Sequence, residues 1–491
     1  MQKFSTKNFV LLGICLMLGS TSLRAQLVPH LSLLSQWNRH AGPYGYNSLW
    51  GWSGNGHEYA ILGSLDSIYF FDVTDPTKPK LCDARAGRNN DSKNREFKTY
   101  KHYCYAVGDA FPSSLQIFDL NYLPDSVHKV YDNDTLSTAA HNLWFDHDRL
   151  YLAWNKKNYT KNGVPIDQVF PMTVVSVANP EVPVFMANLK SPYIVINGQK
   201  KLLFDYVHDM FVRNDTAYCS CGEGGLYIFN YKNPNNPVLL QAITDYENFT
   251  VYNHSNYLSD DGNYLVFADE TPGIKVKLFD VSALKDTTDH DPALNVKCLF
   301  GSHSDEGSTA HNPFIKGNLI FTSYYQDGVV VWDRTDPNNV KEIASYDTYP
   351  QNDNVAVTNG KYSGLLGCWN VYPFFSSGTI IASDMANGLF VLKMDSVSAI
   401  NGKYISDNEL NIKIMQNPFH DNILMRADAQ QPEDITISIH DMLGREWYSS
   451  RYHCAQGESM ISIPSAGIDA NLLLLTVSSP SGTYSRKLVK E

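Results

Sequence analysis

The chain carries little charge for its length and lacks the features that mark nucleic-acid-binding and membrane-spanning proteins. Of its 491 residues 18% are charged, and 39 basic residues face 51 acidic ones. No cluster of Lys and Arg is present, so nucleic acid is not expected as a partner, because that binding depends on concentrated positive charge. Outside the first 25 residues no apolar run reaches the roughly 20 residues of a membrane-spanning helix. No transmembrane segment is therefore expected.

Cysteines and familiar catalytic motifs are also scarce. Eight cysteines are scattered along the chain, and seven remain once Cys15 in the N-terminal apolar stretch is set aside, which does not suggest a disulfide framework. Cys219 and Cys221 share a strand face at a spacing that fits neither a zinc knuckle nor a redox pair, so buried thiols are expected. The string "HEYAI" (57–61) has Ile61 where a zinc protease motif needs a second histidine. There is no nucleophile elbow, phosphate loop or dinucleotide fingerprint.

Residues 1–25 have the pattern of a cleaved secretory signal. Lys3 and Lys7 precede an apolar stretch from Phe9 to about Gly19, and small residues lead to Ala25. We therefore expect a signal peptide over 1–25 and a secreted, extracellular protein.

Aromatic and β-branched residues are plentiful, and they recur with a period of about fifty residues. The spacing between equivalent positions runs from 47 residues (Phe71 to Phe118) to 60 (Trp332 to Leu392). The seven recurring runs are "SIYFFDVTDPTKP" (67–79), "SLQIFDLNYLP" (114–124), "TVVSVANPEVP" (173–183), "GLYIFNYKNPNNP" (225–237), "VKLFDVSALKD" (276–286), "GVVVWDRTDPNNV" (328–340) and "GLFVLKMD" (388–395). Repeats of this length that hold four strands are typical of β-propellers.

The sixth repeat can be divided into four strands. They are "HNPFI" (311–315), "NLIFTSYY" (318–325), "GVVVWD" (328–333) and "VKEIASYDTY" (340–349). The last repeat lacks an outer strand, and we expect residues 31–42 to supply it and so close the ring without an open edge. The sequence thus predicts a seven-bladed β-propeller over residues 31–395.

The period stops after about Asp395. Residues 396–410 are expected to be a linker. Residues 411–491 alternate apolar and polar positions between turn signals, which predicts a small Ig-like β-sandwich. The expected fold is therefore all-β, a seven-bladed β-propeller followed by a small Ig-like β-sandwich sorting domain.

Several long strings resemble a known family over about residues 35–395. They are "YNSLWGW", "FDVTDPTKP", "NHSNYLSDDGNYLVFADET", "STAHNPF" and "GCWNVYPFFSSGTIIASDMANGLFVL". They are similar to the choice-of-anchor B family of secreted bacterial proteins, which carry LVIVD-type propeller repeats. This resemblance implies the propeller fold and supplies no reaction or catalytic residue.

The tail resembles the type A C-terminal sorting domain of the Bacteroidetes type IX secretion system. The matching strings are "NPF", "HDMLGR" and the final "RKLVK", whereas the family's late Gly-hydrophobic-Tyr is replaced by "ANLLLLTV" (470–477). This resemblance implies export by the type IX machinery, with the mature protein anchored at the cell surface or released.

A polar residue recurs near the start of each inner strand. His141, His208 and His311 each lie ten residues before an aromatic residue, and His254 lies eleven residues before Leu265. The same offset gives Arg95 and Asn370. Because the inner strands of a propeller line its channel, these residues are expected to ring the channel mouth.

Acidic residues are expected on the same face. They include Glu270, in a turn between second and third strands, and Glu306, just before the sixth repeat. Imidazole and carboxylate together suit Zn²⁺, or Mn²⁺ or Fe²⁺ where oxygens dominate. A divalent metal is therefore one expectation, with His141, His208, His254 and His311 as ligands and Arg95, Glu270, Glu306 and Asn370 as ligand-binding residues. The alternatives are a polar ligand such as a carboxylate or sugar, and scaffolding that satisfies neighbouring backbones.

Two functions from different classes remain. The sequence favours a cell-surface binding module whose partner is an extracellular glycan or protein, with Trp154, Tyr324 and Tyr325 near the mouth as sugar-stacking candidates. The alternative is a metal-dependent extracellular hydrolase or lyase that uses the histidine cluster, although no catalytic residue is identified.

Overall fold

The structure, a computed structural model, consists of two compact units, Pro29–Ser396 and a second one that contains Val397–Glu491. It describes residues 28–40, 42–161, 164–244, 246–247, 250–285, 295–301, 307–351, 365–397, 410–441, 446–468, 472–479 and 482–490. The predicted signal peptide and most of the predicted linker lie outside these residues. The described residues contain strands, the 3₁₀ turn η1 (Ser282–Lys285) and a 3₁₀ stretch at 350–351, and no α-helix. Among these described residues, no helix is long and apolar enough to cross a membrane.

The larger unit contains seven four-stranded sheets among its described residues. The first three are β2 (Tyr46–Gly54), β3 (His57–Ser64), β4 (Ser67–Asp72), β5 (Lys80–Ala86); β6 (Arg95–Tyr100), β7 (Tyr103–Gly108), β8 (Leu115–Asp119), β9 (His128–Asn133); and β10 (Asn142–Asp146), β11 (Arg149–Lys161), β12 (Val164–Ser176), β13 (Val184–Asn188). The next three are β16 (Asp209–Arg213), β17 (Thr216–Ser220), β18 (Leu226–Asn230), β19 (Val238–Ile243); β20 (Asn253–Leu258), β21 (Tyr264–Asp269), β22 (Val276–Asp280), β23 (Asn295–Phe300); and β24 (Ala310–Lys316), β25 (Leu319–Tyr324), β26 (Gly328–Asp333), β27 (Lys341–Tyr346). The last combines β28 (Cys368–Tyr372), β29 (Thr379–Asp384) and β30 (Gly388–Val397) with β1 (Val28–Trp37). The all-β prediction is confirmed, and so is the division of the sixth repeat into β24–β27.

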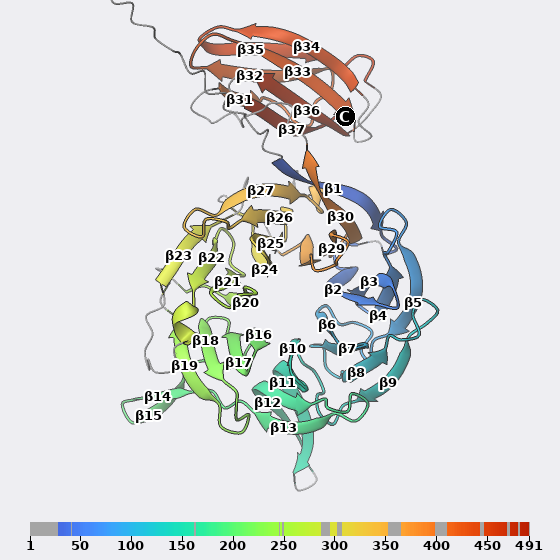
Figure 1. Ribbon diagram of the computed structural model, residues 1–491, viewed down its shortest axis with the longest axis vertical. Helices are drawn as coiled ribbons and strands as arrows, with labels where there is room; N and C mark the ends of the chain where they lie inside the picture. Colours follow the sequence, from blue (N-terminus) through green and yellow to red (C-terminus); the bar gives the residue numbers. More distant parts are fainter. Residues whose placement is uncertain are drawn as a thin grey trace, which may run out of the picture. The chain divides into compact units, whose positions relative to one another are not determined.

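The sheets are arranged in a closed, propeller-like ring (Figure 1). The innermost strands are β2, β6, β10, β16, β20, β24 and β28, and each contacts the innermost strand of both neighbouring sheets. As predicted for residues 31–42, β1 is the outer strand of the sheet that contains β28–β30. The Gln36 side chain also donates from Nε2 to the Asn387 carbonyl at 2.9 Å. The ring is therefore closed by the two ends of this unit.

Apolar side chains hold adjacent sheets together face to face. Ile117 of β8 and Leu143 of β10 belong to one buried cluster, for example, although they come from different sheets. Such strands are buried on both faces, which explains why the sequence shows short continuous apolar runs there rather than strict alternation. The cysteines follow the same pattern, since Cys219 and Cys221 are buried free thiols as predicted.

Two hairpins extend beyond the repeat. The strands β11 and β12 have 13 residues each, longer than the other strands of their sheet. Between β13 and β16 lies the hairpin β14 (Tyr193–Ile196) and β15 (Gln199–Leu202), whose eight strand residues are all exposed. Its turn is Asn197-Gly198, both with positive φ, which is the usual chemistry of a two-residue hairpin turn.

The smaller unit has two sheets around one apolar core. One contains β31 (Leu410–Ile414), β32 (Asn422–Ala429) and β35 (Gly457–Pro464), and the other contains β34 (Glu446–Cys454), β33 (Glu433–Asp441), β36 (Leu472–Ser479) and β37 (Gly482–Val489). Their inward residues form one cluster that includes Ile423, Ile437 and Leu475, all fully buried. The burial of β32 alternates strictly, so its inner face is apolar and its outer face, apart from Leu424, is polar.

Candidate functional site

The four predicted histidines occupy equivalent places at one end of neighbouring inner strands. His141 and His208 immediately precede β10 and β16, and His254 and His311 are the second residues of β20 and β24. Their rings follow one another around the ring of sheets, with centroids 4.1 Å (His141–His208), 4.4 Å (His208–His254) and 4.2 Å (His254–His311) apart. The repeat thus places four imidazoles in one continuous row.

The Nδ1 atom of three of these rings joins one sheet to the next. His208 Nδ1 lies 3.2 Å from the carbonyl of His254, and His254 Nδ1 lies 3.0 Å from the carbonyl of His311. His311 Nδ1 lies 2.5 Å from the carbonyl of Trp369. A carbonyl only accepts, so Nδ1 carries the proton and donates in each ring. The tautomer that results leaves the Nε2 lone pair of each ring unprotonated.

Burial keeps these three rings neutral. Burial and neighbouring histidines hold the pKa of His208 and His311 well below the ordinary histidine value. Burial and the charge of His141 lower the pKa of His254 to about 3. At neutral pH all three are therefore imidazoles with an available lone pair, the form that binds a metal ion.

His141 stands apart electrostatically. Burial lowers its pKa, but the carboxylate of Asp109, whose Oδ2 lies 3.3 Å from Nδ1, outweighs burial and the net pKa is raised. The same contact, against the opposing effect of burial, lowers the pKa of Asp109. This end of the row therefore differs from the other three rings, because its Nδ1 faces a carboxylate and not a carbonyl.

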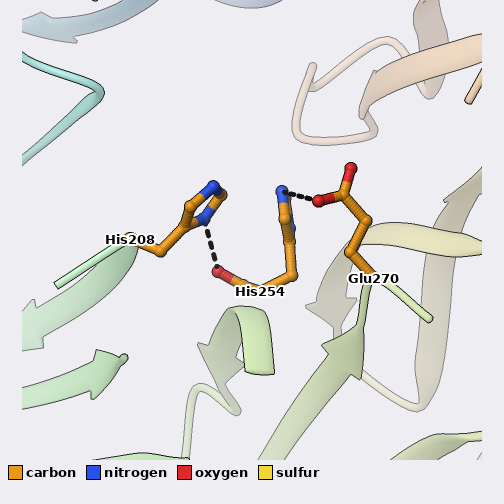
Figure 2. A group of neighbouring side chains, drawn as sticks. All are labelled: His208, His254 and Glu270. Carbon is orange, nitrogen blue, oxygen red and sulfur yellow. Dashed lines mark hydrogen bonds and ion pairs between the residues drawn. The ribbon is translucent and has the colours of Figure 1, made fainter. Parts of the chain in front are cut away.

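Glu270 brings a carboxylate to the middle of the row (Figure 2). Its Oε2 lies 4.0 Å from His254 Nε2, and its Oε1 accepts a 2.6 Å hydrogen bond from Tyr325 Oη. One ligand atom each from His208, His254 and Glu270 lies within 4.8 Å of the other two. Ligands on a tetrahedral Zn²⁺ with bonds of about 2.1 Å lie about 3.4 Å apart. A closing movement of about 1 Å would therefore let these three atoms share one ion.

The other predicted metal ligands flank this group. Among the described residues, neither His141 nor His311 belongs to a set of three potential ligand atoms this close. The second such set, formed by Asp146, His147 and Asp215, has its Asp215 carboxylate already paired with Arg149 at 2.7 Å. Of the four predicted metal ligands, His208 and His254 thus belong to the candidate metal site, together with the carboxylate of Glu270.

The predicted ligand-binding residues Arg95 and Asn370 are engaged in joining sheets. Arg95 is 1% exposed, and its guanidinium donates to the carbonyls of Ser64, Leu65 and Asn89 at 3.2, 2.9 and 2.7 Å. Burial lowers its pKa to about 10. The structure does not bring either side chain into the group of His208, His254 and Glu270.

Asn370 is also buried, and its amide donates to the carbonyl of Leu49 at 2.8 Å, between the last sheet and the first. Its Oδ1 accepts from the backbone N–H of Val371. The remaining predicted residue, Glu306, lies outside the described residues.

Aromatic side chains surround the row of histidines. Trp154 stacks on Tyr206 with centroids 4.3 Å apart, and Tyr206 Oη donates to Tyr252 Oη at 3.0 Å. Tyr325 and Trp369 contact His311 with centroids at 4.6 and 4.9 Å. Trp154 and Tyr325 thus lie near the histidines as the sequence suggests.

Neither Tyr324 nor Tyr325 offers a ring surface to a sugar. Tyr324 is 1% exposed and packs against Trp332 inside its own sheet, and Tyr325 is 2% exposed and packs against His311. Adjacent residues of a strand point to opposite faces, which separates Tyr324 from Tyr325.

A polar cavity lined by the inner strands was missed by the sequence analysis. Its charged and amide side chains are Glu96, Lys98, Asn142, Asp209, Asn256, Asn312 and Asn370. Lys98 Nζ lies 3.6 Å from Glu96 and 4.4 Å from the centre of the Trp50 ring. Burial raises the pKa of Asp209 to about 7, since the opposing effect of Lys98 is smaller. The polar residues that follow Arg95 and His208 in "REFK" and "HDM" were the available signal.

Comparison with family models and with curated proteins found no match. Among solved structures, the β-propeller domain of Cps50 (Swd1) from Myceliophteria thermophila is similar, with 11% identity, a TM-score of 0.44, and coverage of 69% of this chain and 93% of that one. A Bacteroides uniformis protein provisionally described as a 6-phosphogluconolactonase gives 12% identity, a TM-score of 0.48, and coverage of 68% and 89%. The computationally designed Ika8 protein gives 10%, 0.43, and coverage of 72% and 96%. At these values the similarities say nothing about function.

Proposed function

We propose that this chain is a secreted, cell-surface-directed binding module built on a seven-bladed β-propeller, with its ligand site at the channel mouth around His208, His254 and Glu270. Seven four-stranded sheets and a closed ring of inner strands support the blade number. The two-sheet C-terminal unit supports an Ig-like sandwich that serves as the type IX sorting domain, in keeping with the resemblance of its sequence.

The observation that supports the site is that the two ring nitrogens of His208 and His254 have different roles. Scaffolding accounts for the Nδ1 bonds, which join adjacent sheets. It does not account for Glu270, whose carboxylate faces His254 Nε2 and is oriented by the Tyr325 hydroxyl. Two neutral Nε2 lone pairs and an oriented carboxylate form a donor set for a divalent cation such as Zn²⁺. The further ligand would be an extracellular glycan or protein group.

The test is metal content and Zn²⁺ titration of the full chain, prepared without chelator or affinity histidines. His254→Asn retains an N–H near the position of Nδ1 and removes Nε2, and Glu270→Gln retains an acceptor for Tyr325 and removes the charge. We expect about one bound ion in the wild type and at least a tenfold loss of affinity in each variant.

His311→Asn is the matched control because it makes the same change at the equivalent place of the next inner strand, outside the group of three. It should retain the ion. Equal loss in His311→Asn and His254→Asn would contradict the proposed ligand set, and no binding by the wild type would refute a metal site.

A metal-dependent extracellular hydrolase or lyase is the second candidate. Two histidines and one carboxylate leave coordination positions open for water or substrate, as catalytic metal sites require. Turnover of an extracellular polymer that is lost on chelation and in His254→Asn, and restored by metal in the wild type, would favour the enzyme over the binding module.

A further inference from the structure

A buried lysine lies between two carboxylates in the sheet formed by β20–β23. Lys277 and Asp269 are both 0% exposed. Lys277 Nζ lies 2.8 Å from Asp269 Oδ2 and 2.9 Å from Glu247 Oε1. Its third donor bond goes to the carbonyl of Lys275 at 2.9 Å.

The strand register sets this contact. Lys277 of β22 pairs with Phe267 of β21, and Asp269 lies two residues farther along β21, on the same face. Diagonal neighbours of this kind are within reach of a long side chain. Glu247 comes from the segment between β19 and β20, so the three groups meet only in the folded sheet.

The surroundings are aromatic and hold the acid in place. Lys277 Nζ lies 5.3 Å from the ring centre of Tyr246 and 5.9 Å from that of Phe267. Tyr246 Oη donates to Asp269 Oδ1 at 2.7 Å and accepts from Asn253 Nδ2 at 3.2 Å. One carboxylate oxygen is thus fixed by a phenol, while the other faces the amine.

Burial of an ammonium with two carboxylates is costly, because desolvation offsets much of the attraction between the charges. Amide formation requires an amine and a carboxylic acid in contact, and the 2.8 Å contact between Lys277 Nζ and Asp269 Oδ2 lets one proton pass between these two atoms without any movement of the chain. These two neutral groups are the reactants of amide formation, and their geometry is held by the sheet.

We propose that Lys277 and Asp269 become joined by an intramolecular amide (isopeptide) bond, formed in the folded protein with Glu247 as the proton-transfer group. The Nζ lone pair attacks Cγ of the protonated Asp269 carboxyl group, and Tyr246 Oη stabilises the oxyanion that develops on Oδ1. Glu247 takes a proton from Nζ and delivers it to Oδ2. The Nζ–Cγ bond forms, the Cγ–Oδ2 bond breaks, one water leaves, and nothing is oxidised or reduced.

This inference does not depend on the proposed function, but it bears on the same sheet. Asp269 immediately precedes Glu270, and Asn253, which bonds Tyr246, immediately precedes His254. A covalent bond here would hold the ends of β20 and β21 that carry two residues of the candidate site.

Peptide mapping of the full chain tests the proposal directly. Trypsin does not cleave after an acylated lysine, so the cross-linked protein yields peptide 276–285 attached to peptide 233–275, lighter than their sum by one water molecule. We expect this branched peptide in the wild type and its complete absence in Lys277→Arg. Glu247→Gln should fold and accumulate the branched peptide at least tenfold more slowly.

The matched control is Glu223→Gln, the same change at an exposed turn position. It should retain the cross-link. Recovery of only the separate peptides 276–277 and 278–285 from the wild type, even after long incubation of the folded protein, would overturn the proposal. Equally fast cross-linking in Glu247→Gln would overturn the role given to Glu247.

Discussion

Replacement of Arg95 by lysine should destabilise the larger unit although the positive charge is kept. The guanidinium makes three hydrogen bonds to carbonyls, and a lysine ammonium placed on the same stem reaches about one of them. A hydrogen bond to a charged group contributes about 1.5–3 kcal/mol. The lower end applies, because the carbonyls of Ser64 and Leu65 also accept from Asn47 and from the N–H of Ser92. Two lost bonds therefore predict a loss of about 3 kcal/mol in the free energy of unfolding.

Urea unfolding followed by tryptophan fluorescence measures this loss, and Arg88→Lys is the control. Arg88 is exposed and pairs with Asp132 at 3.2 Å, so its replacement should cost no more than about 0.5 kcal/mol. Arg95→Lys and Arg88→Lys with equal midpoints would refute the reasoning, and Arg95 would then be open again as a ligand-binding residue. Gly87→Ala supplies a second approach, since its Cβ would lie 2.1 Å from Arg95 Nη1 and displace the guanidinium.

Three further predictions concern the contact between the sheet of β24–β27 and the sheet of β28–β30, pH dependence and the C-terminal unit. Gly367→Ala should lower the thermal midpoint of unfolding far more than Gly378→Ala. Both glycines have positive φ, but only at Gly367 would the added Cβ lie 1.6 Å from a backbone oxygen, that of Tyr325. Equal midpoints of the two variants would contradict this prediction. Burial raises the pKa of Asp384 to about 7 from 3.8, so its stabilisation is complete below pH 3.8 and is lost as pH rises through 7. That loss is on the order of 4 kcal/mol, and Asp384→Asn should flatten the decline of unfolding free energy between pH 4.5 and about 7.5. Leu475→Ala should cost about 2–5 kcal/mol and increase hydrogen exchange within residues 410–490 alone, because the two units have separate cores.

Much of the fold is predictable from this sequence because each repeat has the same order of apolar runs and turn residues. In the sixth repeat, apolar runs and Asp-Asn-Pro turns place β24–β27 to within a few residues. The strand that closes the ring is also predictable, since residues 31–42 resemble an outer strand and the last repeat lacks one. The hairpin β14–β15 interrupts the period, and its Asn-Gly turn was the local signal that could have identified it.

The site was predictable in position but not in chemistry. The offset of ten residues places the histidines correctly, since equivalent residues of equivalent strands reach the same end of the ring. It cannot show which ring nitrogen meets a carbonyl, because that depends on the neighbouring sheet's backbone. Arg95 illustrates the limit: its place in the repeat is right, yet its guanidinium is committed to three carbonyls.

The residue at the repeated position forms a hydrogen bond that joins one sheet to the next. Its type decides whether a polar atom is left over to bind a ligand. Arginine at this position uses its polar atoms on carbonyls of the backbone, as Arg95 does. The last sheet has Trp369 at this position, because the register pairs the predicted residue, Asn370, with Ser383 as it pairs Asn312 with Ser323, one place farther along the strand. Histidine forms the hydrogen bond between sheets with Nδ1 alone and retains Nε2. A set of potential metal ligands forms where a carboxylate also lies near that second nitrogen, as Glu270 lies near Nε2 of His254. Replacement of His208 and His254 by asparagine therefore tests the two roles separately. It keeps a side-chain N–H for the hydrogen bond between sheets, and it removes the Nε2 atom that would bind the metal.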